Sequence, residues 1–240
     1  MQRYFLNGNI NNFFFDSEDI FHIQKVMKMR VNETIEVVIN SKAYLAKIVS
    51  VNPIQIELID EILHDSEIKN DIKLFYCLVK GDKLDLVIQK AVELGVKEIV
   101  LVQSKYCVTK YDTKEIKKKL ERFKGIIKGA CRQSHRLVIP TLDKIVNINE
   151  ISTSLMCDKN FIAYENEIGG TQKTKEYFET INDNESVSLL VGPEGGFSTE
   201  EVELMNKKGF INISLGKRIL RSETAAITAL SDLTFILESK

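Results

Sequence analysis

The stretch VGPEGGFS, residues 191–198, places three glycines, one proline and one glutamate between an apolar run and a predicted helix. The apolar run, 187–191, is typical of a buried strand. A strand can pass into a helix with one glycine or none, so three glycines indicate that the backbone itself has a role here. Ser198 and Glu201 form a capping box, which lets the helix predicted over Thr199–Lys208 begin without a ligand. The glycines are therefore free for another purpose.

A neutral or cationic ligand suits this loop better than a phosphate. A Walker loop needs Lys followed by Ser or Thr after its glycines, and the dinucleotide fingerprint needs GxGxxG after an early strand; the loop has neither. Glu194 in the middle of the loop would also repel a phosphate. Backbone N–H and C=O groups could instead recognise the polar edge of a ligand. The alternative is a tight turn that binds nothing.

A second loop, LGKRILRSETAA at residues 215–226, follows another strand pattern. Two arginines, Arg218 and Arg221, flank the apolar pair Ile219 and Leu220, which could sandwich a flat ring while an arginine reaches a developing negative charge. Ser222 is predicted to cap the last helix, with Glu223 in its first turn. Core packing and surface charge would explain the same residues without a ligand.

Strands alternate with helices from residue 72 onward. Buried-strand patterns occur at 72–79, 98–102, 161–164, 187–191 and 211–215, and helical patterns at 82–94, 114–133, 199–208 and 222–238. This alternation predicts an α/β domain with a mostly parallel sheet, at 71–240. Ligands of open parallel sheets bind at the carboxyl ends of the strands, so both loops lie where a site is expected.

Residues 1–70 have a different pattern. A short helix is predicted over Ser17–Met29, with Asp16 or Ser17 as its N-cap. Three β-rich runs follow it, at 34–39, 43–51 and 54–59, separated by turn-forming residues. We therefore expect a small β-barrel-type module, joined to the second domain by the polar stretch 64–71.

The charge of the chain is unevenly distributed, although the net charge of the 240 residues is only −1. Between Lys105 and Pro140 there are eleven Lys or Arg residues and three acidic residues, a net charge of +8 against −9 for the remainder. This segregation is the expected footprint of a face that binds a polyanion such as RNA. A solvated helix face is the alternative.

Cysteines and histidines are scattered, at 77, 107, 131 and 157 and at 22, 64 and 135. Without close pairs we predict reduced cysteines, no disulfide framework and no metal site. The N-terminus lacks the apolar stretch of a signal peptide, and no run approaches the length of a membrane span. We therefore expect a cytoplasmic protein that has no contact with a membrane.

Together, the two glycine- and arginine-containing loops resemble a known family. GPEGGFS-TEEVE followed by LGKRILRSETAAITAL is similar to the C-terminal signature of the RsmE-type 16S ribosomal RNA uridine-N3 methyltransferases, members of the SPOUT superfamily. HIQKVMKMR, KGDKLDLVIQKAVELGVKEI and ACRQSHRLVIP match the same family in order, so the resemblance covers nearly the whole chain. It implies a trefoil-knotted α/β domain over 71–240 and a PUA-like β-barrel that binds RNA over 1–70.

The resemblance also implies S-adenosylmethionine as cofactor, held by backbone groups of three loops. The glycines would then allow the main chain to approach the cofactor closely, and Glu194 would lie near the cationic sulfonium. The residues implied as cofactor-binding are Tyr164, Glu165, Val191, Gly192, Pro193, Glu194, Gly195, Gly196, Leu215, Gly216, Arg218, Ile219 and Leu220.

The implied reaction transfers a methyl group to N3 of a uridine in small-subunit ribosomal RNA, within the assembled subunit. N3 must lose a proton first, so the site needs a base and a positive group for charge on the uracil oxygens. We assign the positive group to Arg221 and the base to Glu223 or Glu194, unless the proton leaves to water. The alternatives are a catalytically inactive RNA-binding protein on the same scaffold and a nucleotide-dependent α/β enzyme.

RNA contacts and a homodimer complete what the resemblance implies. Residues expected to contact RNA are Arg3, His22, Arg30, Lys118, Arg122, Arg132, Gln133 and Arg136. The dimer would pack through the knot, with the last helix at the interface. Its apolar stripe, Ala226, Leu230, Leu233 and Leu237, fits that interface, although burial within one subunit explains the stripe equally well.

Overall fold

The computed structural model describes residues 1–109, 111, 113–167 and 170–240. The chain divides into two compact units, the first formed by Met1–Glu67 with Cys131–Val138 and the second by Ile68–Ala130 with Ile139–Lys240. The sequence did not indicate that residues 131–138 belong with the N-terminal residues. They do so because Arg136 forms a buried ion pair with Glu67, 2.8 Å between Nη2 and Oε2. Within the described ranges, no helix is both long and apolar enough to cross a membrane.

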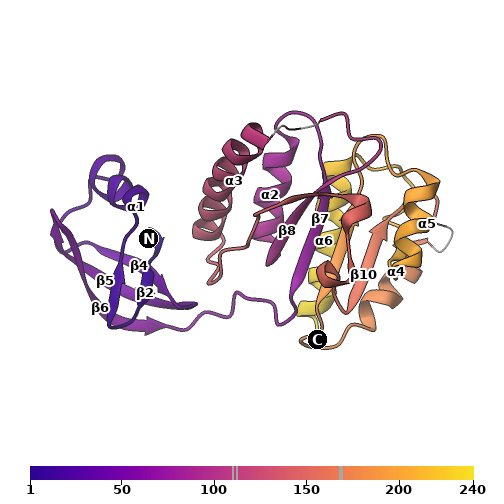
Figure 1. Ribbon diagram of the computed structural model, residues 1–240. Coiled ribbons are helices and arrows are strands. Elements are labelled where there is room, and N and C mark those ends of the chain that lie inside the picture. Colours follow the sequence, from indigo (N-terminus) through magenta and orange to yellow (C-terminus); the bar gives the residue numbers. More distant parts are fainter. Residues whose placement is uncertain (110, 112, 168–169) are drawn as a thin grey trace. The chain divides into compact units, whose positions relative to one another are not determined.

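The second unit is built on a six-stranded sheet in the order β12-β10-β11-β7-β8-β9, with every neighbouring pair parallel (Figure 1). β7 and β11 lie at its centre and are almost entirely buried, which explains why their sequences, IKLFYC and VSLLV, are mostly apolar. The strands are β7 (Ile72–Cys77), β8 (Glu98–Gln103), β9 (Ile145–Asn147), β10 (Lys159–Ala163), β11 (Val187–Val191) and β12 (Ile211–Ile213). The predicted parallel α/β domain is confirmed.

Helices follow most of these strands. They are α2 (Lys83–Glu93), α3 (Thr113–Gln133), α4 (Gly170–Glu179), α5 (Thr199–Lys207) and α6 (Ser222–Glu238), with short 3-10 turns η2 (Ile148–Glu150) and η3 (Thr153–Leu155). The capping box of α5 is formed as predicted: Ser198 accepts from the backbone N–H of Glu201, and Glu201 accepts from that of Ser198.

The last helix returns from the edge of the sheet to its centre. α6 follows the edge strand β12 but packs against α2, α4 and β11 (Figure 1, yellow). The connection over residues 214–221 therefore has to cross back over the sheet. The stripe formed by Ala226, Leu230, Leu233 and Leu237 is buried within this unit, so packing inside one subunit accounts for it.

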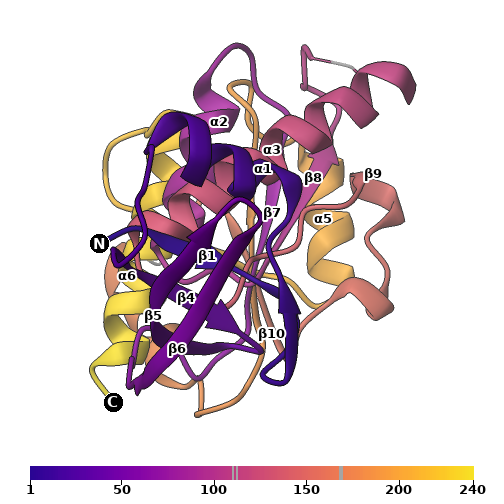
Figure 2. The same ribbon diagram turned by 90° about the vertical axis from the view of Figure 1, so that its left-hand side faces the viewer.

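The first unit contains a four-stranded sheet in the order β1-β4-β5-β6 and a separate hairpin, β2-β3. Figure 2 shows the long antiparallel strands β4, β5 and β6 side by side. The elements are β1 (Arg3–Phe5), β2 (Asn7–Asn9), β3 (Asn12–Phe14), α1 (Ser17–Phe21), the π-helical η1 (His22–Val26), β4 (Thr34–Ile39), β5 (Lys42–Val51) and β6 (Ile54–Ile62). Their core includes the buried residues Tyr4, Ile23, Ile35, Val37, Ala46 and Ile48.

The N-terminal helix differs from its prediction. Asp16 caps it as expected, its side chain accepting from the N–H of Asp19 at 2.8 Å. However, the helix changes to π geometry at His22 and ends at Val26, three residues before the predicted end. Lys28 has φ +49°, which breaks the helical path before Met29.

Candidate functional site

Three segments of the second unit meet at the carboxyl ends of β10, β11 and β12 and line a cavity of about 370 Å³. This volume lies within the range of small-molecule sites. All thirteen residues predicted to bind the cofactor line this cavity, as does Arg221. Ala163, Phe197, Ser214, Lys217, Ser222 and Ala225 complete the lining. Ile219 is 87% exposed, so the cavity rim presents an apolar side chain without cover from the described chain.

Each glycine of the first loop has a structural reason of its own. A Cβ at Gly192 would lie 3.0 Å from the ring of Phe197, and one at Gly195 would lie 2.9 Å from Cβ of Tyr106. Gly196 has φ +68°, a conformation that side chains disfavour. The loop is therefore closely packed against Phe197 and Tyr106, while residues 192–196 line the cavity.

The hydroxyl of Ser222 links the two loops. It donates a hydrogen bond to the carbonyl oxygen of Gly192 and is hydrogen-bonded, at 3.0 Å, with the hydroxyl of Tyr76 in β7. Burial is the main cause that raises the pKa of Tyr76, so this phenol is neutral. The prediction that Ser222 caps α6 is wrong, because Arg221 occupies the N-cap position and the Ser222 side chain is engaged with Gly192.

Lys83, in the first turn of α2, lies between the two carboxylates predicted as candidate bases. Its Nζ is 3.1 Å from Oε1 of Glu194 and 3.6 Å from Oε2 of Glu223. The backbone N–H of Lys80 also donates to Glu194 Oε1, at 3.4 Å. One ammonium group thus joins the glycine loop to the beginnings of two helices, a connection that the sequence alone did not reveal.

These contacts make both carboxylates poor candidates for the base. Burial acts to raise the pKa of Glu194, but backbone hydrogen bonds and Lys83 outweigh it and the net pKa is lowered. Glu223 is not among the described residues that line the cavity, and its Oε2 is buried. Arg221, by contrast, lines the cavity and is exposed, as its predicted role requires.

The residues predicted to contact RNA fall into three groups by exposure. Arg30, Lys118, Arg122 and Gln133 are exposed, and Arg122 forms an ion pair with Asp85. His22 and Arg132 are partly buried: the Tyr4 hydroxyl is 2.9 Å from His22 Nδ1, and Arg132 pairs with Asp19. Arg3 and Arg136 are 2% exposed, so the predicted RNA contact does not hold for these two arginines.

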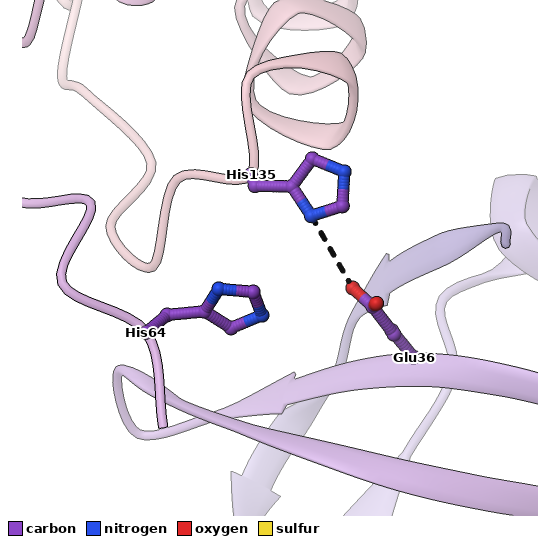
Figure 3. A group of neighbouring side chains, drawn as sticks. All are labelled: Glu36, His64 and His135. Atoms are coloured by element: carbon purple, nitrogen blue, oxygen red, sulfur yellow. Dashed lines mark ion pairs between the residues drawn. The ribbon is translucent and has the colours of Figure 1, made fainter. Parts of the chain in front are cut away.

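Arg3, which is buried, instead organises a cluster in the first unit that extends to the exposed side chain of His135. Nη2 of Arg3 lies 2.7 Å from both Glu36 Oε2 and His64 Nε2. His135 Nδ1 lies 3.5 Å from the same carboxylate oxygen (Figure 3). The ligand atoms of Glu36, His64 and His135 lie within 4.8 Å of one another, close enough to hold a metal ion. The sequence spacing did not reveal this group. The guanidinium of Arg3 already places a positive charge beside Glu36 and His64, and its repulsion disfavours binding of a metal cation there.

Family models match both units of the chain. A model described as an RNA methyltransferase domain matches residues 66–234, and one described as an RNA methyltransferase PUA domain matches residues 15–61. Ribosomal RNA small subunit methyltransferase E of Mesomycoplasma hyopneumoniae (strain 232) is 33% identical over 96% of this chain and 98% of its own length.

Solved structures give the same result. A methyltransferase from Legionella pneumophila, in complex with bound SAM, has a TM-score of 0.86 and 30% identity, covering 97% of this chain and 96% of that one. A ribosomal RNA small subunit methyltransferase E from Neisseria gonorrhoeae, bound to S-adenosyl methionine, has a TM-score of 0.83 and 29% identity, covering 96% and 95%. The chain belongs to the ribosomal RNA small subunit methyltransferase E family of RNA methyltransferases.

Proposed function

We propose that this protein methylates N3 of a uridine in 16S ribosomal RNA, with S-adenosylmethionine as the methyl donor. The observation that carries the proposal is the cavity formed by the glycine loop and the Leu215–Arg221 segment. Its walls offer backbone groups of Gly192–Gly196, the apolar pair Ile219 and Leu220, and two exposed guanidinium groups, at Arg218 and Arg221. These features fit a donor that combines a flat ring, a polar amino acid end and a cation.

The residues of the chain orient the reactants and stabilise charge. Bound S-adenosylmethionine supplies an electrophilic methyl group. Ile219 and Leu220 hold a flat ring, and Arg221 stabilises negative charge on a uracil oxygen as N3 loses its proton. Since Lys83 and Lys80 occupy Glu194 Oε1, and Glu223 lies outside the cavity lining, we propose that the proton leaves to water. Arg221 favours this step by lowering the pKa of the uridine.

The basic helix α3 is the proposed surface for RNA phosphates. Lys117, Lys118, Arg122 and Lys124 are exposed along it. In the first unit, Arg30 is exposed and lies within the PUA domain match at residues 15–61. A target base must leave its stack to reach a cavity of this kind, so we expect an unpaired or flipped uridine, presented by the assembled small subunit in the cytoplasm.

We further propose a trefoil knot and a homodimer. The return of α6 from the edge strand β12 to β11 and α2 supports a chain path that threads a loop. Phe235 of α6 is 73% exposed, and it offers an apolar contact for a second subunit. The stripe buried beneath the same helix does not contribute to that contact.

The test is to incubate the protein with labelled S-adenosylmethionine and either free ribosomal RNA or small subunits, and to digest the RNA to nucleosides. The proposal predicts label in 3-methyluridine. Label at a ribose or in a cytidine would overturn the uridine assignment. Binding of RNA without any binding of S-adenosylmethionine would favour the inactive RNA-binding alternative.

A further inference from the structure

Tyr106 lies beside the donor cavity without lining it. A Cβ added at Gly195, which lines the cavity, would lie 2.9 Å from Cβ of Tyr106 and 3.5 Å from Cγ, the first atom of the ring. Tyr106 is not among the described residues that line the cavity, and it is 44% exposed. An aromatic side chain therefore borders the donor site and leaves the donor's own space free.

Few aromatic side chains of the second unit are exposed in this way. Within the described part of this unit, the exposed aromatic residues are Tyr106 and Phe235. Phe235 lies thirteen residues after Ser222 in α6, which is about 20 Å along the helix from the cavity lining. Tyr106 is thus the exposed aromatic residue that lies next to the glycine loop.

Hydrogen bonds fix the backbone on both sides of Tyr106. The N–H of Cys107 donates to the Ser104 carbonyl oxygen at 3.2 Å and closes a turn, and the Cys107 side chain is buried. The N–H of Lys105 donates to Glu201 Oε1 at 2.7 Å, and Oε2 of the same carboxylate accepts from the N–H of Ser198 at 2.9 Å. Glu201 therefore joins this turn to the end of the glycine loop. A ligand that contacts Tyr106 meets a backbone that is already ordered, which lowers the entropic cost of binding.

The methyl acceptor of the proposed reaction has to lie at the border of the donor cavity. Its N3 atom must approach the methyl carbon to about 3–3.5 Å. A uridine that has left its stack also loses the neighbouring bases that covered its faces. Proteins that bind unstacked bases replace those neighbours with aromatic side chains. The exposed position of Tyr106 beside Gly195 meets this requirement.

A cation accompanies the ring. Nζ of Lys105 lies 5.6 Å from the centre of the Tyr106 ring and 3.4 Å from Oε2 of Glu200. The Lys105 side chain is 56% exposed, so a phosphate next to a stacked base can reach its ammonium group. An aromatic ring beside a positive charge is the combination with which proteins bind single-stranded nucleic acids.

We propose that the ring of Tyr106 is the stacking surface for the target uracil. The base packs on the ring with its N3 edge toward the donor, and Lys105 neutralises an adjoining phosphate. This inference rests on the proposed function, because it takes an unpaired uridine as the methyl acceptor. Tyr106 then recognises the acceptor and not the donor, so changes at this residue affect the two substrates differently.

Tyr106→Ala tests the role of the ring, because it keeps the Cβ atom that packs nearest to Gly195. Affinity for S-adenosylmethionine, measured by calorimetric titration, should be unchanged. The value of kcat/KM for small subunits should fall by about tenfold to a hundredfold, the loss expected for one stacked base. Tyr106→Phe keeps the ring and should retain the wild-type value.

Val108→Ala is the matched control, since it removes an exposed apolar side chain from the same segment without removing a ring. It should leave both measurements unchanged. An unchanged kcat/KM in Tyr106→Ala, or an equal loss in Tyr106→Phe, would overturn the proposal. A loss of donor affinity in Tyr106→Ala would overturn it as well, because the residue would then act on the glycine loop.

Fluorescence gives a direct test of stacking. The chain has no tryptophan, so Tyr106→Trp introduces a single fluorescent reporter at this position. In the presence of S-adenosylmethionine, pentauridylate should quench its emission, whereas a pentamer of abasic ribose phosphates should not. Equal signals with the two pentamers would contradict stacking of a base on this residue.

Failure of the proposed function would give a different pattern. Wild-type protein that binds no S-adenosylmethionine, or that forms no 3-methyluridine, would contradict the proposed function before Tyr106 is changed. An active wild-type protein together with a fully active Tyr106→Ala variant would contradict the stacking role alone.

Discussion

Three glycines within five residues, 192–196, satisfy three different local requirements. Gly192 gives space to the ring of Phe197, Gly195 to Tyr106, and Gly196 adopts a positive φ. The sequence suggested one shared reason, access of a ligand to bare backbone. The structure adds that a Cβ at Gly192 or Gly195 would come into close contact with Phe197 or Tyr106, because the loop is already closely packed there.

Gly195→Val should abolish binding of S-adenosylmethionine. A Cβ at this position lies 2.9 Å from Tyr106 Cβ, and the branched side chain must displace either Tyr106 or the loop that lines the cavity. Calorimetric titration measures the effect. The control is Gly125→Val in α3, where an added Cβ meets nothing within 4 Å. Normal affinity in the Gly195 variant would show that the donor binds elsewhere.

The sequence located the site loops better than it assigned charged residues. The residues of each site loop are contiguous in the sequence, so the motifs VGPEGGFS and LGKRILRSETAA were enough to predict where the site lies. Ion pairs are not local: Arg3 meets Glu36 thirty-three positions away, and Arg136 meets Glu67 sixty-nine positions away. Both arginines were therefore predicted as RNA ligands although they are buried in pairs. Lys83 was missed for the same reason.

At the scale of elements, Lys83 joins three segments that are far apart in the sequence. Its ammonium group connects the start of α2 with Glu194 in the glycine loop and Glu223 in the first turn of α6. Side chains of Lys83 and Glu194 are each about one-third exposed, so the pair is only partly screened by solvent. We infer that this ion pair holds the glycine loop in the position that binds the donor.

A double-mutant cycle tests this link. Lys83→Met should weaken S-adenosylmethionine binding, because Glu194 loses its partner and the loop loosens. In a Glu194→Gln background the same substitution should have little further effect, a coupling of about 0.5–3 kcal/mol. Additive losses would contradict the link. Lys90→Met, which breaks the Lys90–Glu93 pair on the same helix, is the control and should leave affinity unchanged.

The cluster around Arg3 predicts a pH dependence for the first unit. The pKa of His64 is lowered, first by burial and then by the positive charge of Arg3, with a smaller contribution from His135. The negative charge of Glu36 opposes this shift. The folded state therefore binds this proton less readily than the unfolded chain, so stability falls as the pH drops below about 6.5. His64→Gln should reduce this fall, measured by urea unfolding across pH. His22→Gln is the control, and an unchanged pH dependence in the His64 variant would contradict the assignment.

Element bounds followed the sequence where the pattern was long and regular. β4, β11 and α6 have the predicted limits, because a β-rich run, a mostly apolar run and a long helical stripe are each distinctive. β1 was missed, since three residues give no period and their pairing with β4 depends on contacts thirty-three residues away. β9 was missed for the same reason, being three residues at the sheet edge.

At the scale of the whole molecule, charge segregation is the feature that relates the chain to RNA. The net charge is only −1, yet the basic residues between 105 and 140 leave the remainder acidic. Exposed Lys117 and Lys118 on α3 can neutralise phosphates, whereas Arg136 is committed to Glu67. A smaller set of residues than the sequence count therefore contributes to the RNA-binding surface.

Replacing Lys117 and Lys118 together with Gln should weaken RNA binding uniformly across sequences. Each lost phosphate contact should reduce the slope of log K against log salt by about 1. Affinity measured by filter binding over a range of salt concentrations checks this. Lys42→Gln, in the first unit, removes one exposed lysine outside α3, paired with Glu61, and serves as the control. An unchanged slope in the α3 variant would remove this helix from the RNA surface.

The most direct measurement is a crystal structure of the protein soaked with S-adenosylmethionine. We predict density for the donor in the cavity formed by residues 163–165, 191–197 and 214–222, with its methyl group facing the opening through which a uridine can enter. Density for the donor at any other place on the chain, with this cavity left to solvent, would contradict the account.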